Sequence, residues 1–257
     1  MTPSPFIIVI PVRYHSTRLP GKPLSLINGK SMLSHVVARC ESSNAKHVLV
    51  TTDDERIAAH AKQLNVQVVM SSKTCRSGSD RIATSLNEIT HNAEDIIVNV
   101  QGDEPLISSE NINQVAQLLS TSDADVSSLY QSITSLSELS NPNVVKVIVD
   151  LQERALAFSR SELPYAQNRE MLENYFEKGY YKKHIGMYAY RTQFLNGWSD
   201  IKQTPLEVAE SLEQMSWLQQ GIVMQMAKAK SRVAMDVNTQ DDLERICQLW
   251  DEMAVVQ

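Results

Sequence analysis

The order of the apolar segments between residues 6 and 100 is the feature that most constrains the fold. Short strand-like runs at 6–12, 47–52, 66–70 and 95–100 alternate with segments of helical apolar spacing at 31–43, 55–64 and 80–89. This order predicts an α/β fold with a doubly wound, mostly parallel sheet and right-handed crossovers. Ligands bind beyond the carboxyl ends of the strands in such sheets. The loops after Val12 and Val100 should therefore meet at one crevice.

The second half of the chain is less regular. Residues 143–150 and 154–158 have the pattern of a hairpin, and residues 184–191 alternate like a strand with one solvent-exposed face. Residues 205–219 and 239–253 each predict an amphipathic helix. The aromatic and polar segment 167–183 suggests either a mobile flap or a plain surface excursion.

Charge is distributed unevenly along the chain. The 257 residues include 30 Asp and Glu against 24 Lys and Arg, a balance opposite to that of a basic nucleic-acid-binding protein, so we expect no nucleic-acid partner. The first acidic residue, however, is Glu41. The cations that precede it are Arg13, Arg18, Lys22, Lys30 and Arg39. This basic start favours an anionic ligand, although a solvated loop can have the same composition.

The cysteines and the N-terminal apolar run point to the cytoplasm. Cys40, Cys75 and Cys247 are scattered, without a C-x-x-C pair, so we expect reduced thiols and neither a disulfide framework nor a zinc site. The apolar run 6–12 is too short to span a membrane, and no basic residue precedes it as in a signal peptide. We therefore expect a cytoplasmic protein without a membrane partner.

The loop after the first predicted strand suits a phosphate ligand. Residues 11–24 read PVRYHSTRLPGKPL, with hydroxyls at Ser16 and Thr17 and a turn at Gly21. Its cations are Arg13, Arg18 and Lys22. Arginine makes forked contacts with phosphate oxygens and lysine provides a point charge, so together they can neutralise most of a triphosphate.

Two better-known phosphate motifs do not fit. The loop lacks the three glycines of a dinucleotide-binding G-x-G-x-x-G motif. The sequence GKS at 29–31 resembles the end of a P-loop, but the earlier glycine of that motif is replaced by Leu24. We interpret GKS as a turn followed by a helix cap.

Asp103 lies three residues beyond the apolar run 95–100, in the sequence QGDEP. A carboxylate at the end of a central strand can hold Mg²⁺ beside phosphates, because magnesium binds few protein oxygens together with phosphate oxygens and water. A lone aspartate here can also cap a turn. The basic loop expected opposite favours the magnesium site.

These motifs together resemble those of the sugar-activating cytidylyltransferases, and most closely the 3-deoxy-manno-octulosonate (Kdo) cytidylyltransferases. The resemblance rests on the loop 11–24 and on VNVQGDEP at 98–105. Shorter matches follow the same order along nearly the whole chain: TD at 52–53, SG and DR at 77–81, NPNVVK at 141–146, FSR at 158–160, HIGMY at 184–188 and LEQ at 212–214.

The resemblance implies a Rossmann-like sheet of the nucleotidyltransferase type with a smaller inserted β-rich lobe. Residues 1–257 would form a single domain with a CTP-binding part (1–130), a sugar-binding and dimerisation lobe (131–200), and closing helices with a second metal segment (201–257). The implied reaction transfers CMP from CTP to an acidic eight-carbon sugar for lipopolysaccharide biosynthesis. It would require Mg²⁺ and take place in a homodimer.

The resemblance also assigns residues to the site. The implied catalytic residues are Arg13, Arg18, Lys22 and Asp103. The implied nucleotide-binding residues are Pro11, Arg13, Ser16, Arg18, Lys22, Ser77, Gly78, Arg81 and Gln101. The implied sugar-binding residues are Arg160, His184, Tyr188, Glu213 and Gln214. Without the resemblance, Arg81 could be a surface arginine, His184 a packed core histidine, and the glutamates at 207, 210 and 213 a solvated helix face.

The second metal ligand departs from the family pattern. The family has V-D-T-P-E-D-L near its C-terminus, where residues 235–243 read MDVNTQDDL, so Asn238 stands where the family has aspartate. Asp236 lies two residues earlier, and positions two apart share one face of a strand. We predict Asp103 and Asp236 as metal ligands, with Asn238 a weaker neighbour.

A second departure concerns the sugar. The family commonly continues LEQ with Leu-Arg, whereas this chain has Met215 and Ser216. Loss of a positive charge there suggests that an 8-amino variant of the sugar is a substrate. Two alternatives remain open: an acylneuraminate cytidylyltransferase, and a non-catalytic nucleotide-sugar-binding α/β protein.

Overall fold

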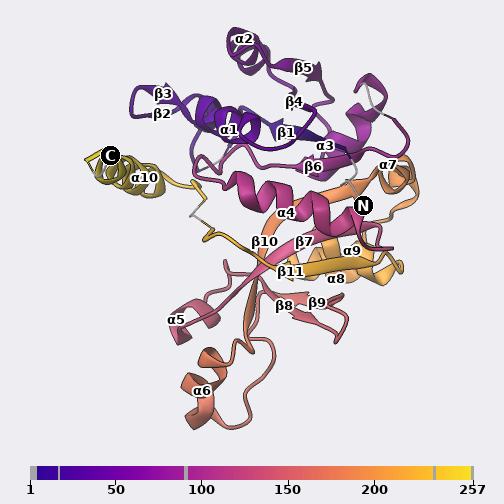
Figure 1. Cartoon of the computed structure of the whole chain (residues 1–257), viewed down its shortest axis with the longest axis vertical. Helices are drawn as coiled ribbons and strands as arrows, with labels where there is room; N and C mark the ends of the chain where they lie inside the picture. The colour runs from indigo at the N-terminus through magenta and orange to yellow at the C-terminus, as the bar shows by residue number, and fades with distance from the viewer. Residues whose placement is uncertain (1–4, 17, 90–91, 234–235, 256–257) are drawn as a thin grey trace.

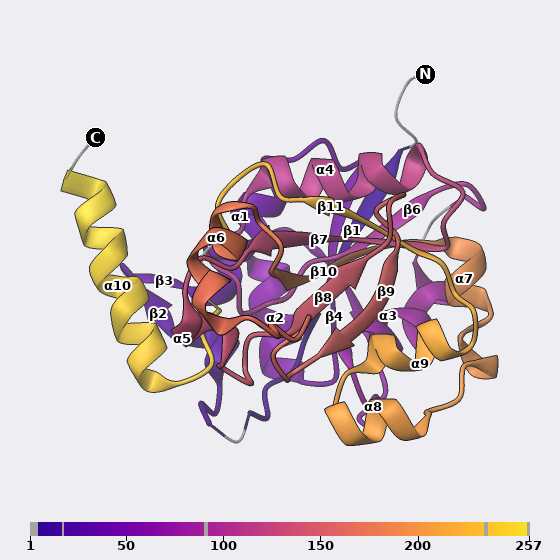
Figure 2. The ribbon, with the colours of Figure 1, turned by 90° about the horizontal axis from the view of Figure 1, so that it is seen from below.

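The structure is a computed structural model that describes residues 5–16, 18–89, 92–233 and 236–255, with side chains described as far as Trp250. Its main sheet contains β1 (Phe6–Val12), β4 (His47–Thr52), β5 (Gln67–Met70), β6 (Ile96–Asn99), β7 (Val126–Ser132), β8 (Lys146–Val149), β9 (Ala155–Ser159), β10 (Lys182–Arg191) and β11 (Met224–Lys228). The strand order is β11-β7-β10-β6-β1-β4-β5, with β8 attached to β10 and β9 to β8 (Figures 1 and 2).

Strand β1 is buried along its whole length. Because its successive side chains point to opposite faces of the sheet, both faces must be covered, and helices cover them. Ile8 and Ile10 pack with α1 (Met32–Glu41), α2 (Glu55–Gln63) and α4 (Ser109–Ser120). Ile7 and Val9 pack with α3 (Gly78–Ser85), α7 (Thr192–Asn196) and α9 (Glu213–Gln219). Strands β5, β4, β1 and β6 pair in parallel. The predicted doubly wound, mostly parallel α/β fold is confirmed.

Strand β10 runs antiparallel to both of its neighbours, β6 and β7. Residues 185 and 187–190 are buried, so the prediction of one solvent-exposed face for 184–191 is wrong. The reason is that both faces of β10 are covered: Ile185, Met187 and Ala189 pack in one cluster with α4, and Tyr188 and Tyr190 pack against Trp217 of α9. Strand β7, which the apolar pattern did not reveal, pairs with its other edge. The antiparallel strand thus lies inside the sheet.

The lobe extends from the ends of β7 and β10 and includes the antiparallel pair β8–β9, which confirms the predicted hairpin (Figure 1). It also holds α5 (Leu136–Leu139), the 3-10 helix η3 (Arg169–Met171) and α6 (Leu172–Glu177). Leu172 and Phe176 are buried against Ile133 and Leu139. The segment 167–183 is therefore folded and packed on its own small core.

The single helix predicted for 205–219 is wrong. The chain forms α8 (Pro205–Glu210) and α9, separated by Ser211 in the left-handed region at φ 52°. Arg160 explains the break, because its Nε donates to the Glu210 carbonyl at 2.7 Å and its backbone N–H donates to the Glu210 carboxylate at 2.9 Å. These bonds satisfy the last carbonyl of α8, which has no partner within the helix.

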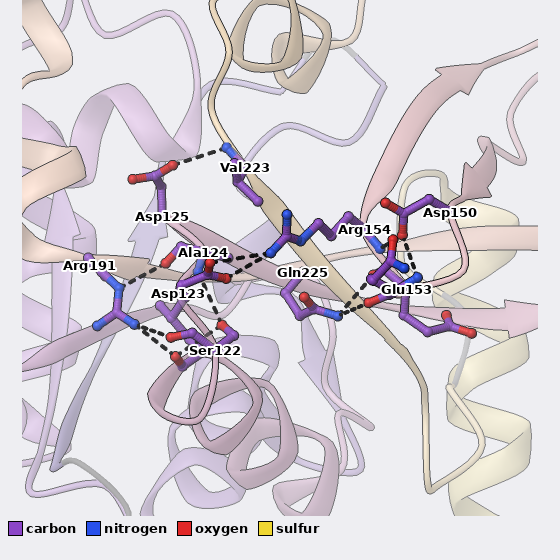
Figure 3. A network of polar contacts seen from close by, with 12 residues as sticks. Ser122, Asp123, Ala124, Asp125, Asp150, Glu153, Arg154, Arg191, Val223 and Gln225 are labelled. Carbon is purple, nitrogen blue, oxygen red and sulfur yellow. Dashed lines mark hydrogen bonds and ion pairs between the residues drawn. The ribbon is translucent and has the colours of Figure 1, made fainter.

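A network at the other end of the sheet ties β11 and the β8–β9 turn to the loop before β7 (Figure 3). Arg191 donates to the carbonyls of Leu119, Ser122 and Ala124 at 2.6–3.1 Å. Arg154 pairs with Asp123 at 3.0 Å. The residues labelled in Figure 3, together with Leu119, are called the edge network below.

The C-terminal helix α10 (Gln240–Val255) packs beside the short hairpin of β2 (Leu26–Ile27) and β3 (Lys30–Ser31), away from the lobe (Figures 1 and 2). Val237 and Leu243 share a buried cluster with Leu19 of the loop 11–24, which we call the phosphate loop. Ser31 caps α1 by accepting from the Ser34 N–H at 3.1 Å, which confirms the reading of GKS as a turn and helix cap.

Three short 3-10 helices complete the described elements: η1 (Lys22–Leu24), η2 (Leu86–Glu88) and η4 (Trp198–Asp200). Within the described ranges, no helix is both long and apolar enough to cross a bilayer.

Candidate active site

The phosphate loop and the end of β6 meet as predicted. Lys22 Nζ lies 2.6 Å from Asp103 Oδ2, although 81 residues separate the two in the sequence. Arg18 donates to the Asn238 side-chain oxygen at 3.0 Å, and the Val237 N–H donates to the Asp103 carbonyl at 3.0 Å. The loop after β1, the loop after β6 and the segment before α10 thus share one site.

The phosphate loop has a defined turn. Gly21 adopts φ +71°, and its N–H donates to the Tyr14 carbonyl at 3.1 Å. A Cβ at position 21 would lie 3.1 Å from the Tyr14 hydroxyl oxygen, so only glycine fits without strain. The Arg56 guanidinium stacks on the Tyr14 ring at 3.3 Å. Thr17, which we expected to contribute a hydroxyl, lies outside the described residues.

A cavity of about 250 Å³ opens between this loop and α3, and we call it the first cavity. The predicted nucleotide-binding residues all line it: Pro11, Arg13, Ser16, Arg18, Lys22, Ser77, Gly78, Arg81 and Gln101. Asp103, Asn238, Cys75 and Arg76 also face it. Five cations and one carboxylate therefore surround this cavity in the described part of the chain, a charge balance that suits a polyphosphate.

The first turn of α3 forms one wall of the first cavity. Ser77 caps the helix, and Gly78 lies so close to Pro11 that a Cβ would approach the proline ring to 3.1 Å. Arg81 is buried, and its guanidinium donates to Asp53 at 3.2 Å and to Ser71. Arg81 is therefore a fixed part of the wall and not a surface arginine.

A second cavity of about 710 Å³ adjoins the first. Of the predicted sugar and metal residues, Tyr188, Glu213, Gln214, Asp103 and Asp236 line it. The two cavities share the lining residues Arg76, Ser77, Gln101, Asp103 and Asn238. Asp103 therefore lies at the boundary, where a group bound in one cavity can meet a group bound in the other.

Glu213 belongs to a buried network behind the second cavity. Its carboxylate accepts from Ser79 Oγ at 2.6 Å, and Ser79 lies 2.8 Å from the Tyr190 hydroxyl. Burial raises the pKa of Glu213. Glu207 also lines this cavity, and Glu210 accepts from Ser159 at 2.7 Å. The spacing of the three glutamates suggests one solvated helix face. These positions are not on one face, because the helix breaks at Ser211.

His184 and Arg160 do not line either cavity. His184 Nε2 lies 2.9 Å from Ser128 Oγ, and its ring packs between Phe158 and Tyr188. Burial lowers the pKa of His184 to about 3, so the ring is neutral. The Arg160 guanidinium donates to backbone carbonyls, including that of Pro142 at 2.9 Å. Sugar binding by these two residues stays a prediction.

The carboxylates at the boundary suit a divalent cation. Loss of hydration raises the pKa of Asp236 to about 6, with a further contribution from the charge of Asp103 and an opposing one from Lys22. Burial raises the pKa of Glu104, and the charges of Asp236 and Asp103 add to it. Oxygen donors of this kind match the preference of Mg²⁺. Within the described residues, no three His, Cys, Asp or Glu side chains are placed to share one ion, and Mg²⁺ at this boundary stays a prediction.

Some residues that line the two cavities carry no signal of their own in the sequence. Arg76 and Glu104 each adjoin a predicted residue, but neither has a motif of its own. Trp198 and Trp217 form an aromatic wall of the second cavity, with ring centroids 6.1 Å apart. They lie far along the chain from the phosphate loop, so only the fold reveals them as neighbours of the site.

The sequence matches the family model described as "Cytidylyltransferase" over residues 7–231. The chain therefore belongs to the cytidylyltransferase family of nucleotidyltransferase enzymes. Curated relatives include the 3-deoxy-manno-octulosonate cytidylyltransferase of Aeromonas hydrophila, 42% identical over 245 residues that cover 94% of this chain and 97% of the relative. That of Pseudomonas fluorescens is 42% identical over 254 residues, covering 96% of this chain and 99% of the relative.

A solved structure is similar over nearly the whole chain. It is a CMP:2-keto-3-deoxy-manno-octonic acid synthetase complexed with CTP. The TM-score is 0.88 and the sequence identity 34%, and the match covers 97% of this chain and 100% of the other.

Proposed function

We propose that this chain transfers CMP from CTP to 3-deoxy-manno-octulosonate, releasing pyrophosphate and forming a CMP-sugar for lipopolysaccharide biosynthesis. One observation carries the proposal: a cation-rich cavity adjoins a larger polar cavity, and Asp103 lies at their boundary. The names of the relatives at 42% identity support this sugar. A triphosphate in the first cavity and a sugar in the second would meet at Asp103.

The side chains of this site act by binding, orientation and charge. Arg13, Arg18 and Lys22 balance the negative charge that develops on the phosphates as pyrophosphate leaves. The second cavity orients the anomeric hydroxyl of the sugar for in-line attack on the α-phosphorus, so the reaction requires no covalent enzyme intermediate. Asp103 and Asp236 would hold Mg²⁺, which would supply positive charge beside the phosphates and the sugar hydroxyl.

A second acceptor is favoured by one specific observation. Among the described residues, five side chains with carboxyl groups line the second cavity: Asp103, Glu104, Glu207, Glu213 and Asp236. Ser216, at the position where the resembled family has arginine, hydrogen-bonds to Glu207 and introduces no positive charge. We propose that the 8-amino variant of the sugar is also accepted, because its ammonium group would be attracted to this wall.

We also propose that the enzyme is a cytoplasmic homodimer. Large apolar side chains stand exposed on the lobe, with Leu151 99%, Leu156 60% and Tyr165 77% accessible. Exposed apolar surface of this kind is typical of a protein–protein interface. Sedimentation of the purified chain would measure its mass, and a monomer at micromolar concentration would contradict this proposal.

The decisive experiment measures pyrophosphate release from CTP, UTP and ATP, each with Kdo, 8-amino-Kdo or an acylneuraminate, with and without Mg²⁺. We expect release with CTP and either octulosonate, and only with magnesium. Release with the acylneuraminate alone would favour the related cytidylyltransferases. Binding of CTP without release from any pair would favour a non-catalytic binding protein.

A further inference from the structure

The turn that follows β4 stands beside the first cavity without lining it. Val12 pairs with Thr52 at the carboxyl ends of two neighbouring parallel strands, so the chain leaves both strands at the same edge of the sheet. The phosphate loop follows Val12, and residues 53–56, with the sequence DDER, follow Thr52. We call residues 53–56 the β4 turn. Within the described chain, none of them lines either cavity.

The β4 turn brings two carboxylates close to a site suited to an anion, and each carboxylate is paired with an arginine. Asp53 accepts from Arg81 at 3.2 Å. Asp54 accepts from Nε and from a terminal nitrogen of Arg56 at 3.0 and 2.7 Å. The hydrogen bonds from Arg56 lower the pKa of Asp54 to about 2, so this carboxylate is charged at neutral pH. Pairing offsets the repulsion that a free carboxylate would exert on a phosphate.

Arg56 connects the β4 turn to the phosphate loop. The forked pair with Asp54 fixes the plane of its guanidinium, and the central carbon lies 3.3 Å from the centroid of the Tyr14 ring. Asp54 is itself anchored, because it caps α2 by accepting from the Arg56 N–H at 2.9 Å. The Tyr14 ring is therefore held from the start of a helix.

Tyr14 in turn sets the shape of the phosphate loop. Its carbonyl accepts from the Gly21 N–H at 3.1 Å, which closes the segment 14–21 into a loop. Its hydroxyl oxygen would lie only 3.1 Å from a Cβ on Gly21, so the ring supports the turn directly. Arg18 lies within this closed segment and Lys22 follows it. Fixing Tyr14 therefore restrains both cations.

The same turn also holds the opposite wall of the first cavity. Arg81 of α3 lines that cavity, yet only 4% of its side chain is exposed. Asp53 is its charged partner, and Ser71 accepts a further hydrogen bond. The Ser71 N–H donates to the Thr52 carbonyl at 2.8 Å, so this support also starts at the end of β4. One turn thus contacts the α3 wall through Asp53 and the phosphate loop through Arg56.

We propose that the β4 turn is a brace that sets the two walls of the first cavity for CTP, with Asp54 and Arg56 as positioning residues of the phosphate loop. The inference rests on the proposed function through the nucleotide that occupies this cavity. Neither residue touches the ligand. They hold Tyr14, and with it the loop cations, in the arrangement that a triphosphate requires. A released loop would have to be ordered at each binding event, which weakens the binding of CTP.

Asp54→Asn is the sharpest test, because the brace and simple charge predict opposite signs. Asparagine still caps a helix, so α2 should be retained, but its neutral amide does not make the forked, charge-assisted pair with Arg56. We expect the KM for CTP, and the Kd of CTP measured by calorimetry, to rise about 3- to 10-fold, and the KM for the sugar to change less than about 2-fold. By charge alone, loss of an anion beside the phosphates would lower the KM for CTP.

The matched control is Glu55→Gln, which removes the same charge from the next residue, an exposed one. Its KM for CTP should equal that of the wild type or lie slightly below it. Thermal unfolding of each variant verifies that the fold is retained.

A second set of variants separates the stacked plane from the charge. Arg56→Lys keeps the charge but loses the planar fork, so it should raise the KM for CTP as Asp54→Asn does. Tyr14→Leu should raise it as well, and Tyr14→Phe, which keeps the ring, should raise it much less. The double variant of Tyr14→Leu and Asp54→Asn should lie within about 2-fold of Tyr14→Leu, because both changes remove one contact.

The failures of the two proposals are distinguishable. If the wild type neither binds CTP nor releases pyrophosphate from it, the proposed function is overturned and the brace with it. If the wild type is active but Asp54→Asn keeps or lowers its KM for CTP, the brace alone is overturned. Wild-type behaviour of Arg56→Lys also overturns it, because charge and not the stacked plane would then act. An equal rise in the KM for CTP and for the sugar has the same consequence, because the effect would not belong to the first cavity.

Discussion

The edge network and the first cavity use the same residue types for opposite purposes. At the edge, Arg191 directs its guanidinium at three carbonyls, and Arg154 pairs with Asp123 (Figure 3). In the first cavity, Arg13 has no hydrogen-bond partner among the described residues, and the Arg76 guanidinium has only a 4.0 Å contact with Asp80. Arg191, whose donors are taken by backbone carbonyls, holds the fold together, whereas Arg13 and Arg76 keep open donors toward a ligand. The following experiments test this distinction, from the largest expected effect to the smallest.

Asp103→Asn should give the largest effect, and on activity alone. The substitution removes the carboxylate at the boundary of the cavities, so we expect pyrophosphate release to fall at least about 1000-fold. The free energy of unfolding should change by less than about 1 kcal/mol, because the Lys22–Asp103 pair is partly exposed. Asp123→Asn, in the edge network, is the matched control and should retain full activity. Near-full activity of Asp103→Asn at saturating Mg²⁺ would contradict the assignment.

Arg191→Met should have the opposite profile. Removing the guanidinium leaves the carbonyls of Leu119, Ser122 and Ala124 without their donor, which should lower the free energy of unfolding by about 2–3 kcal/mol. Below the unfolding temperature, kcat and both KM values should match the wild type. Chemical denaturation together with steady-state kinetics measures both quantities. A loss of activity without a loss of stability would break the distinction between edge and cavity.

The pH dependence of stability tests whether His184 is a buried, neutral part of the wall behind the second cavity. Burial lowers its pKa to about 3, below the value of about 6.5 expected in the unfolded chain. Between these values the unfolded state binds the extra proton, so stability should fall as the pH decreases from 6.5, by at most about 1.4 kcal/mol per pH unit. His184→Gln should show a shallower loss between pH 6.5 and 4. An equal slope in the variant would show that this ring is hydrated and titrates normally.

Arg154→Gln should give the smallest effect. Its partner Asp123 is 81% exposed, and surface ion pairs contribute on the order of 0–1 kcal/mol. We expect a decrease in the free energy of unfolding below about 1 kcal/mol and unchanged kinetics. A loss as large as that of Arg191→Met would mean that the ion pair, and not the carbonyl contacts, holds the edge together.

The sequence predicted the part of the fold whose strands each carry a continuous apolar signal of their own. The strands near residues 6–12, 47–52 and 95–100 are continuous apolar runs, and the loops that follow the first and the last of them carry the phosphate-binding pattern, so the first cavity could be located in advance. Strand β7 was missed because VSSLYQS has three serines and a glutamine, although its first five residues are buried. Ser127 and Ser128 tolerate burial only through tertiary hydrogen bonds, to the Val115 carbonyl and to Ile185 and Met187.

The second cavity was predicted less completely. Tyr188, Glu213 and Gln214 were identified by resemblance, but the break at Ser211 depends on Arg160, which lies about fifty residues earlier. A contact over that distance leaves no periodic signal in the sequence. The same holds for Arg76, which comes to line both cavities only once the chain is folded.

The contacts of Val237 with Asp103 and of Asn238 with Arg18 mean that the site is completed late during translation. By the time a ribosome has translated β11, which ends at Lys228, all the strands of the described sheet have been made. The residues that close the phosphate site are still to be translated. A nascent chain can therefore assemble its sheet before it can process a nucleotide. Catalytic competence therefore depends on a segment made after the sheet, and a chain terminated at Lys228 would lack the residues that close the site.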